Sequence, residues 1–143
     1  MAPSQLEQPR RVCNGVDRNR LALILAVLAR HGGIPLGASD VFVSLAGGVR
    51  IEEPGADLAM ALALASAARG VPLAGAGDRP AAAFGEVGLT GELRFVAHPE
   101  RRIAEAAKFG LEPVLAPDGS LRTLRAALAA ALGSPEAAPA RAA

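Results

Sequence analysis

The chain has 143 residues and a formal net charge of +1, so it has room for one domain with a single core and carries no strong field. Hydrophobic residues make up 51% of the chain and aromatic residues only 3%, which predicts an aliphatic core. The longest apolar runs, 21–29 and 58–68, are too short to span a bilayer, which takes ~20 residues. A single cysteine, Cys13, excludes an internal disulfide, and the first residues lack a signal-peptide pattern, so we predict a cytoplasmic protein without membrane contact.

In the first half of the chain, apolar runs alternate with turn signals. Asp17 is a good N-cap for a helix whose face is apolar nearly all round, and His31-Gly32-Gly33 ends that helix. Residues 40–46 alternate in the manner of a strand, here with both faces covered. The predicted elements are a disordered start at 1–5, an edge strand at 6–12, a turn at 13–15, a helix at 18–30, a strand at 40–46, a return arm at 49–51 and a buried helix at 58–68.

The second half is organised around residues 85–106, which predict a strand pair followed by a helix start. Thr90-Gly91 is the expected tight turn between the arms, because glycine adopts positive φ without a Cβ penalty. Pro99 and Glu100 suit the first turn of a helix. The arms are expected to alternate Val87 and Leu89, then Leu93, Phe95 and Ala97, and the helix to bury Ile103, Ala106 and Ala107 while exposing Arg102, Glu105 and Lys108.

The remaining elements complete an α/β pattern in which strands alternate with helices. Ser120 is expected to cap the last helix, and Gly133 to close it. The predicted elements are a short strand at 71–73, a loop at 74–80, a helix at 99–109, a buried strand at 113–117, a helix at 121–132 and a disordered tail at 133–143.

The sequence shows no pattern of residues typical of a metal or nucleotide site. His31, His98 and Cys13 lack metal-ligand spacing, and each histidine is better explained as a helix-end or surface residue. The sequence has no Gly-Lys-Ser/Thr motif, and its one lysine, Lys108, lies inside a predicted helix. We therefore expect no metal and no ATP bound in the P-loop manner by this chain.

The serines and the acidic cluster also have structural explanations. Ser44 and Ser66 lie within apolar runs, where small packing residues are commoner than nucleophiles. Glu52, Glu53 and Asp57 form a cluster that could act in acid/base chemistry. Carboxylates at a helix start more often serve as capping and dipole groups, which is the interpretation we favour.

Nucleic-acid contact is the open question, because all but one of the fifteen basic residues are arginine. Arginine suits bidentate phosphate contacts, and the alternative is a solvated or interface-pairing face. With four Phe and neither Tyr nor Trp, the chain offers no platform for stacking single-stranded bases. The candidate DNA-binding residues lie near two helix starts: Arg10, Arg11, Arg18, Arg20, Arg101 and Arg102.

Four segments in matching order resemble a known family. They are GVDRNRLALILAVLARHGG at 15–33, DVFVSLAGGVRIEEPGADLAMALALAS at 40–66, GEVGLTGELRFVAHPERRIAEAAKFG at 85–110, and the strand ending in Ala116-Pro117. The chain resembles the carboxy-terminal, Lon-protease-like domain of the RadA (Sms) family of bacterial DNA repair proteins, over about residues 6–132. The resemblance implies the α/β (α+β) fold of the Lon proteolytic domain, a variant of the second-domain architecture of ribosomal protein S5.

The resemblance also shows where this chain departs from the active proteases. Lon domains carry a catalytic serine at the start of the first long buried helix and a lysine after the hairpin. The alignment places Gly55 at the serine position and Glu100 at the lysine position. Because glycine has no nucleophile and a carboxylate cannot replace the amine base, we expect no peptide hydrolysis at this site.

The family as a whole implies what the domain does. By the resemblance, a whole protein of this family has a zinc-binding segment, then a RecA-like ATPase, then this domain. It is expected to act as a hexameric motor that drives branch migration of recombination intermediates. ATP, Mg and Zn are therefore expected only in parts that this sequence lacks. The implied role here is a non-catalytic oligomerisation scaffold with auxiliary DNA contacts, with DNA and a RecA-type recombinase as partners. Two alternatives remain open: a peptide-binding pseudo-protease, and a peptidase with an unrecognised site.

Overall fold

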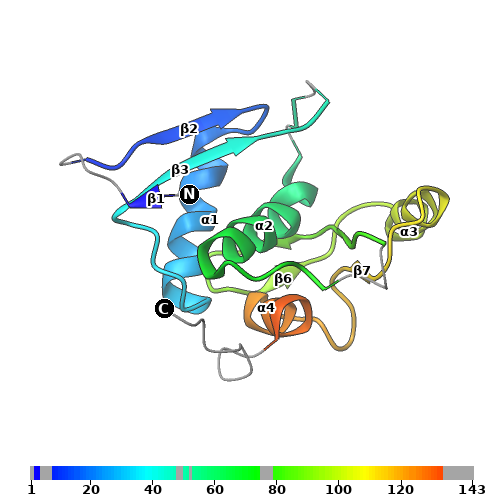
Figure 1. Ribbon diagram of the computed structural model, residues 1–143. Helices are drawn as coiled ribbons and strands as arrows, with labels where there is room; N and C mark the ends of the chain where they lie inside the picture. Colours follow the sequence, from blue (N-terminus) through cyan, green and yellow to red (C-terminus); the bar gives the residue numbers. More distant parts are fainter. Residues whose placement is uncertain (1, 4–7, 48–49, 52, 75–78, 134–143) are drawn as a thin grey trace.

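Helix α2 (Asp57–Arg69) lies between α1 (Arg18–His31) and α4 (Leu124–Leu132), and these three helices hold the core together (Figure 1). The computed structural model describes residues 2–3, 8–47, 50–51, 53–74 and 79–133. In those ranges the fold mixes helices with three small sheets, which confirms the α/β expectation at that level. No helix in them is long and apolar enough to cross a membrane.

The largest sheet contains three strands and lies beside α1 (Figure 1). β2 (Arg11–Asn14) and β3 (Ser39–Ser44) run parallel. β1 (Ala2–Pro3), which falls within the predicted disordered start, pairs antiparallel with the beginning of β3. The strand order β1-β3-β2 places β2 at an edge, as the proline before it had suggested.

Two further sheets of two strands each follow α2. β4 (Ala82–Ala83) pairs in parallel with β7 (Val114–Leu115). β5 (Glu86–Val87) and β6 (Leu93–Arg94) form the antiparallel hairpin that the sequence predicted. The hairpin sits against the start of α2 and the short 3-10 turn η1 (Pro54–Ala56) before it.

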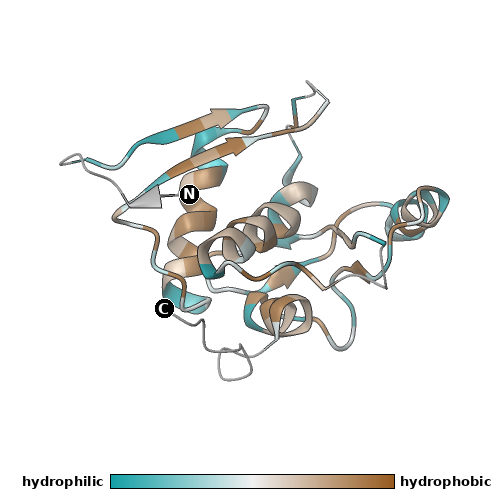
Figure 2. Ribbon diagram, viewed as in Figure 1, coloured by the Kyte–Doolittle hydropathy of each residue, from teal (hydrophilic) through white to brown (hydrophobic). Residues whose placement is uncertain are grey.

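The core is aliphatic, as the composition required. Figure 2 shows the apolar residues of α2 and α4 in brown beside the more hydrophilic α3. The largest fully buried apolar side chains come from all three central helices and two strands: Leu21, Ile24, Val27, Leu28, Leu58, Leu62, Leu124, Val41 and Val87.

Helix α1 begins and ends where the sequence predicted. The Asp17 carboxylate accepts a hydrogen bond from the backbone N–H of Arg20 at 3.1 Å, which satisfies one of the free donors of the first turn. Gly32 closes the helix through a backbone bond to Leu28. Helix α2 likewise ends at Arg69, with Gly70 in the left-handed conformation.

Several predicted boundaries were wrong. Cys13 and Asn14 belong to β2 instead of a turn, because both pair with β3. Residues 71–73 form no strand. Helix α4 begins at Leu124 with Thr123 as its N-cap, while Ser120 binds the carboxylate of Asp118 in the preceding turn. Parts of the predicted loop at 74–80, the return arm at 49–51 and the tail fall outside the described residues.

The strands are also less covered than predicted. Phe42 in β3 is 54% exposed, so one face of that strand is open. The hairpin arms are only two residues long, and Leu89 and Phe95 are mostly exposed beyond them. The turn spans Gly88 to Gly91, whose φ of +83° is the positive value expected for that glycine.

Helix α3 (Pro99–Lys108) buries less of its predicted apolar face than expected, although Glu105 and Lys108 are exposed as predicted. Only Ala106 is buried, Ile103 is 47% exposed and Ala107 is exposed. Arg102, expected outside, is half-buried and pairs with Glu53 at the surface. The helix lies at one side of the molecule (Figure 1), and Ala106 is its one buried residue among those described.

Candidate functional site

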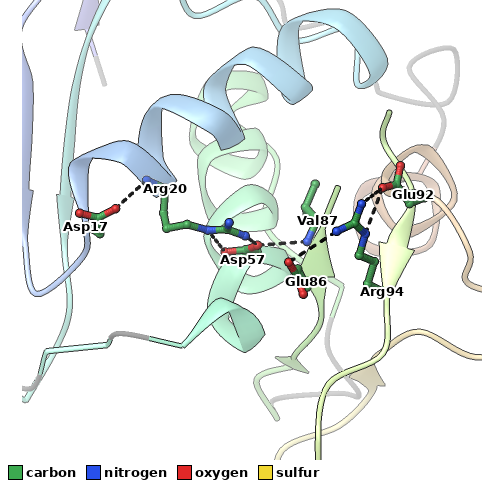
Figure 3. Close-up of polar contacts among 7 residues, drawn as sticks. All are labelled: Asp17, Arg20, Asp57, Glu86, Val87, Glu92 and Arg94. Atoms are coloured by element: carbon green, nitrogen blue, oxygen red, sulfur yellow. Dashed lines mark hydrogen bonds and ion pairs between the residues drawn. The ribbon is translucent and has the colours of Figure 1, made fainter. Parts of the chain in front are cut away.

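Three elements meet at a buried carboxylate, which we call the Asp57 junction (Figure 3). Arg20 of α1 donates two hydrogen bonds to Asp57, one of them from Nε to Oδ1 at 3.1 Å and the other from Nη2 to Oδ2. The backbone N–H of Val87 in β5 donates to the same carboxylate at 3.1 Å. Asp57 is 2% exposed, so this ion pair joins α1, α2 and the hairpin in the interior.

The local sequence explains why these groups meet. Asp17 caps α1 and so fixes its first turn, from which the Arg20 side chain reaches toward α2. The hydrogen bond to Asp57 raises the pKa of Arg20, which keeps the guanidinium charged. Asp57 lies in the first turn of α2, as expected for a dipole group, but the expected side-chain cap is absent because its oxygens accept from Arg20 and Val87.

The hairpin carries a second, surface set of charges beside this junction (Figure 3). Arg94 of β6 binds Glu92 at 2.9 Å and lies 3.9 Å from Glu86 of β5. A hydrogen bond from its own backbone, helped by Arg94, lowers the pKa of Glu92. These exposed pairs order the hairpin surface and contribute little to stability.

Backbone hydrogen bonds tie the hairpin to the turn that holds Gly55. The N–H of Gly85 donates to the carbonyl of Gly55 at 2.9 Å, and the N–H of Leu58 donates to the carbonyl of Gly85 at 3.1 Å. A cavity of about 290 Å³ opens beside this turn. Its charged lining consists of Asp17, Arg20, Arg50, Glu53 and Asp57.

Gly55, expected from the resemblance to stand at the protease serine position, is buried beside an ion pair. Arg102 binds Glu53 at 2.8 Å and also donates from Nε to the carbonyl of Ala97 at 2.9 Å. A Cβ added at Gly55 would lie 2.9 Å from Glu53 Oε1 and 3.2 Å from Arg102 Nη1. The hydrogen bond with Arg102 lowers the pKa of Glu53, while Glu100 is exposed in the first turn of α3. The space above Gly55 is thus filled by a glutamate and an arginine.

Four of the six candidate DNA-binding arginines bind other groups of the protein. Arg10 pairs with Asp40 at 3.1 Å and lies over the Phe42 ring. Arg11 donates to the carbonyls of Ser39 and of Leu36, the latter at 3.0 Å. Arg20 and Arg102 are held by Asp57 and Glu53, respectively.

The two remaining arginines, Arg18 and Arg101, are exposed and make no side-chain hydrogen bond or ion pair within the described residues. Arg18 shares a cleft of about 250 Å³ with Arg11 between β2 and α1. Arg101 and Arg102 share a groove of about 420 Å³ between α3 and β4. The structure thus brings the candidates together as two pairs, Arg11 with Arg18 and Arg101 with Arg102.

The other candidate residues occupy ordinary structural positions. His31 is the last residue of α1 and His98 precedes α3, which confirms their placement at helix ends. Ser66 donates to the carbonyl of Val71 at 2.6 Å. Ser44 is exposed at the end of β3, so the expectation that it is a packing residue was wrong. No cluster of three metal-ligating side chains occurs in the described ranges, and Glu52 lies outside them.

Sequence reasoning missed the pairing of Asp57 and of Glu53 with an arginine. Asp57 and Arg20 are 37 residues apart, and Glu53 and Arg102 are 49 apart. One signal was available: Asp57 directly precedes a long apolar run, where an acid that becomes buried needs a cationic partner. Its partner could not be chosen among fourteen arginines without the fold.

No family model matches the chain. The chain does match curated proteins. It is 50% identical over 117 residues to the DNA repair protein RadA of Haemophilus influenzae, and the match covers 82% of this chain and 25% of that protein. For Escherichia coli RadA the identity is 47% over 114 residues, 80% of this chain and 24% of the relative. For Bacillus subtilis RadA the identity is 41% over 122 residues, which cover 85% of this chain and 26% of that protein. The chain is therefore homologous to a segment that makes up about a quarter of the length of each of these DNA repair proteins.

Proposed function

We propose that this chain is the Lon-like domain of a RadA-type DNA repair protein and acts there as a non-catalytic scaffold. The observation that carries the proposal is the 41–50% identity to three relatives named DNA repair protein RadA, across at least 80% of this chain. Since the chain spans only a quarter of their length, the activity of the whole protein belongs to the proposal. That activity is branch migration of recombination intermediates by a hexameric ATPase.

The proposed scaffold has no peptidase site. Gly55 supplies no nucleophile, and its surroundings are the Glu53–Arg102 ion pair instead of a serine with an amine base. Glu100, at the position aligned with the lysine, is an exposed acid. An arginine held by a carboxylate stays protonated and cannot act as a general base.

In this proposal the domain helps to assemble the ring and adds DNA contacts. Arg18 and Arg101 are the best phosphate ligands, because neither is held by a carboxylate within the described residues. Such contacts bind duplex DNA without sequence preference. ATP, Mg and Zn would belong to other parts of the full-length protein, and a RecA-type recombinase to its cytoplasmic partners.

A salt titration of duplex binding tests the DNA contacts. The chain should bind weakly, in the range of about 10⁻⁴ to 10⁻⁶ M at physiological salt. Arg18→Ala with Arg101→Ala should reduce the salt slope by about 0.9 for each phosphate that the variant no longer neutralises. Arg79→Ala is the control, because Arg79 is exposed, pairs with Glu112 and lines neither arginine-bearing cleft. Absence of binding at low salt would remove the DNA contacts and leave the scaffold.

One feature favours the second candidate, a peptide-binding pseudo-protease. The groove between α3 and β4 is lined by Phe84, Phe109 and Leu111 with Arg101 beside them, which suits an apolar peptide that carries an acidic residue. Incubating the chain with unfolded casein separates three outcomes. Cleavage that resists inhibitors of contaminating proteases indicates a peptidase, binding without cleavage indicates the pseudo-protease, and neither agrees with the scaffold.

A further inference from the structure

Among the residues that the structure describes, the edge of β3 that faces away from β2 is unpaired over most of its length. The amides of Val41 and Leu45 donate to β2 carbonyls, each at 2.9 Å. Since successive residues of a strand direct their N–H and C=O groups to opposite sides, those of Phe42 and Ser44 point to the other edge. In the described part of the chain, β1 pairs with that edge only at Ser39 and Asp40.

An apolar groove of about 340 Å³ runs along this open edge, between β3 and α2. Figure 1 shows that β3 lies between β2 and α2 in this part of the molecule. One wall of the groove is the β3 strand itself, from Val41 to Leu45. The other wall is the outer side of α2, with its residues Ala59, Met60, Ala63, Leu64 and Ala67.

The two edges of this sheet differ in how they are protected. The β2 edge carries Arg11, with Pro9 and Arg10 directly before it, and charge and proline both discourage further pairing. The β3 edge reads Val-Phe-Val-Ser over residues 41–44, with no charge and no proline. An unprotected edge beside an apolar groove is the arrangement that proteins use to accept an added strand.

We propose that this edge accepts an extended segment from the remaining three quarters of the RadA-type protein. The inference rests on the proposed function, because the relatives extend far beyond the part that this chain matches. The added strand runs antiparallel to β3 and continues the β1 ladder, in which Ala2 opposes Asp40 and Pro3 opposes Ser39. Its residues oppose Val41 to Ser44, and its apolar side chains enter the groove against α2.

The direction and the chemistry of the segment follow from the same geometry. A strand that extends the existing ladder keeps the register of β1, so it needs no rearrangement of the sheet. Main-chain bonds to Phe42 and Ser44 supply affinity for any extended peptide. Selectivity comes from the α2 wall, where the small side chains of Ala63 and Ala67 leave room for large apolar residues of the incoming strand.

The test uses the chain together with overlapping synthetic peptides of about ten residues, the upper length of a common strand. The peptides cover the part of Haemophilus influenzae RadA that this chain does not match. Amide hydrogen exchange of Phe42 and Ser44 is the readout, and one peptide should slow it by about tenfold or more. The amides of Val41 and Leu45, already bonded to β2, are the internal reference.

Two variants make the result specific. Ala63→Arg fills the groove with a charged side chain and should abolish the protection, while Ala104→Arg, at an exposed site on α3, should retain it. No protection by any peptide would overturn the proposal, as would protection that survives Ala63→Arg. Equal protection by scrambled peptides would assign the groove to foreign peptides and overturn the proposed source. Duplex binding measured on the same samples shows separately whether the DNA proposal holds.

Discussion

Two arginine–carboxylate pairs link helices to neighbouring elements: Arg20–Asp57 links α1 to α2, and Arg102–Glu53 links α3 to the turn before α2. The two pairs have similar geometry, but their carboxylates differ in burial. Arg20 and Asp57 form a two-pronged contact, and so do Arg102 and Glu53. The Asp57 side chain is 2% exposed, whereas that of Glu53 is 57% exposed. The Asp57 carboxylate has lost its water although Arg20 is 32% exposed, so Asp57 depends on its partner, whereas Glu53 remains hydrated.

The helices at these pairs differ in the same way. Helix α2 buries Asp57, Leu58, Ala61, Leu62, Leu64 and Ala65, while α3 buries only Ala106. Arg102 is thus the main polar contact between α3 and the turn before α2. Ion pairs of similar geometry therefore occur both at α2, a helix of the core, and at α3, a helix at the surface.

The largest expected effect is at the Asp57 junction. Asp57→Ala leaves the buried Val87 N–H and the partly exposed Arg20 without their acceptor, so we expect it to lower the free energy of unfolding by about 3–4 kcal/mol. Urea denaturation followed by circular dichroism measures the change. Asp57→Asn keeps one acceptor oxygen without the charge, so its stability should fall between those of the wild type and Asp57→Ala. A loss below about 1 kcal/mol for Asp57→Ala would contradict the buried-pair assignment.

The same contrast applies to apolar side chains. Leu62→Ala in α2 removes a fully buried side chain, and we expect a cost of about 2–5 kcal/mol from the reduced burial and the cavity. Ile103→Ala in α3, where the side chain is about half exposed, should cost under about 1 kcal/mol. Denaturation curves of both variants give the comparison. Equal losses would show that α3 packs as tightly as α2.

Features that depend on residues close together in the sequence were predicted, and features that depend on distant residues were not. Helix α1 was predicted well, because its cap and apolar face are local signals at Asp17 and the residues after it. The burial of α3 was predicted only in part, because an apolar stripe such as Ile103 and Ala107 shows a face without showing what covers it. The Asp57 junction needs partners from three elements, which only the folded chain brings together.

A smaller effect is expected at the exposed pair, and it should depend on pH. Arg102→Ala should cost at most about 1 kcal/mol near neutral pH, because Glu53 is more than half exposed. Since Arg102 lowers the pKa of Glu53, the stabilisation is present above the unfolded-state pKa of about 4.3 and is lost as the pH falls through the lower, folded value. Stability curves of wild type and variant should therefore converge in acid. A difference that persists there would assign the effect of Arg102 to its packing on Phe84.

The smallest net effect is expected at Gly55, where two changes oppose each other. Gly55→Ala removes the conformational entropy of glycine in the unfolded chain, which stabilises by up to about 1 kcal/mol where the backbone is compatible. The new Cβ must move the ends of Glu53 and Arg102, which are flexible side chains, and loosening that exposed pair costs a similar amount.

We therefore expect almost unchanged stability for Gly55→Ala, together with a Glu53 pKa that returns toward its ordinary value, measured by NMR titration of the carboxylate. A loss above about 2 kcal/mol would show instead that the pair is rigidly held over Gly55. Combining Gly55→Ser with Glu100→Lys should give no cleavage of casein, because a dyad requires placement within about 0.5 Å by a supporting shell. Here Glu53 and Arg102 fill the space beside the new serine and would first have to leave it.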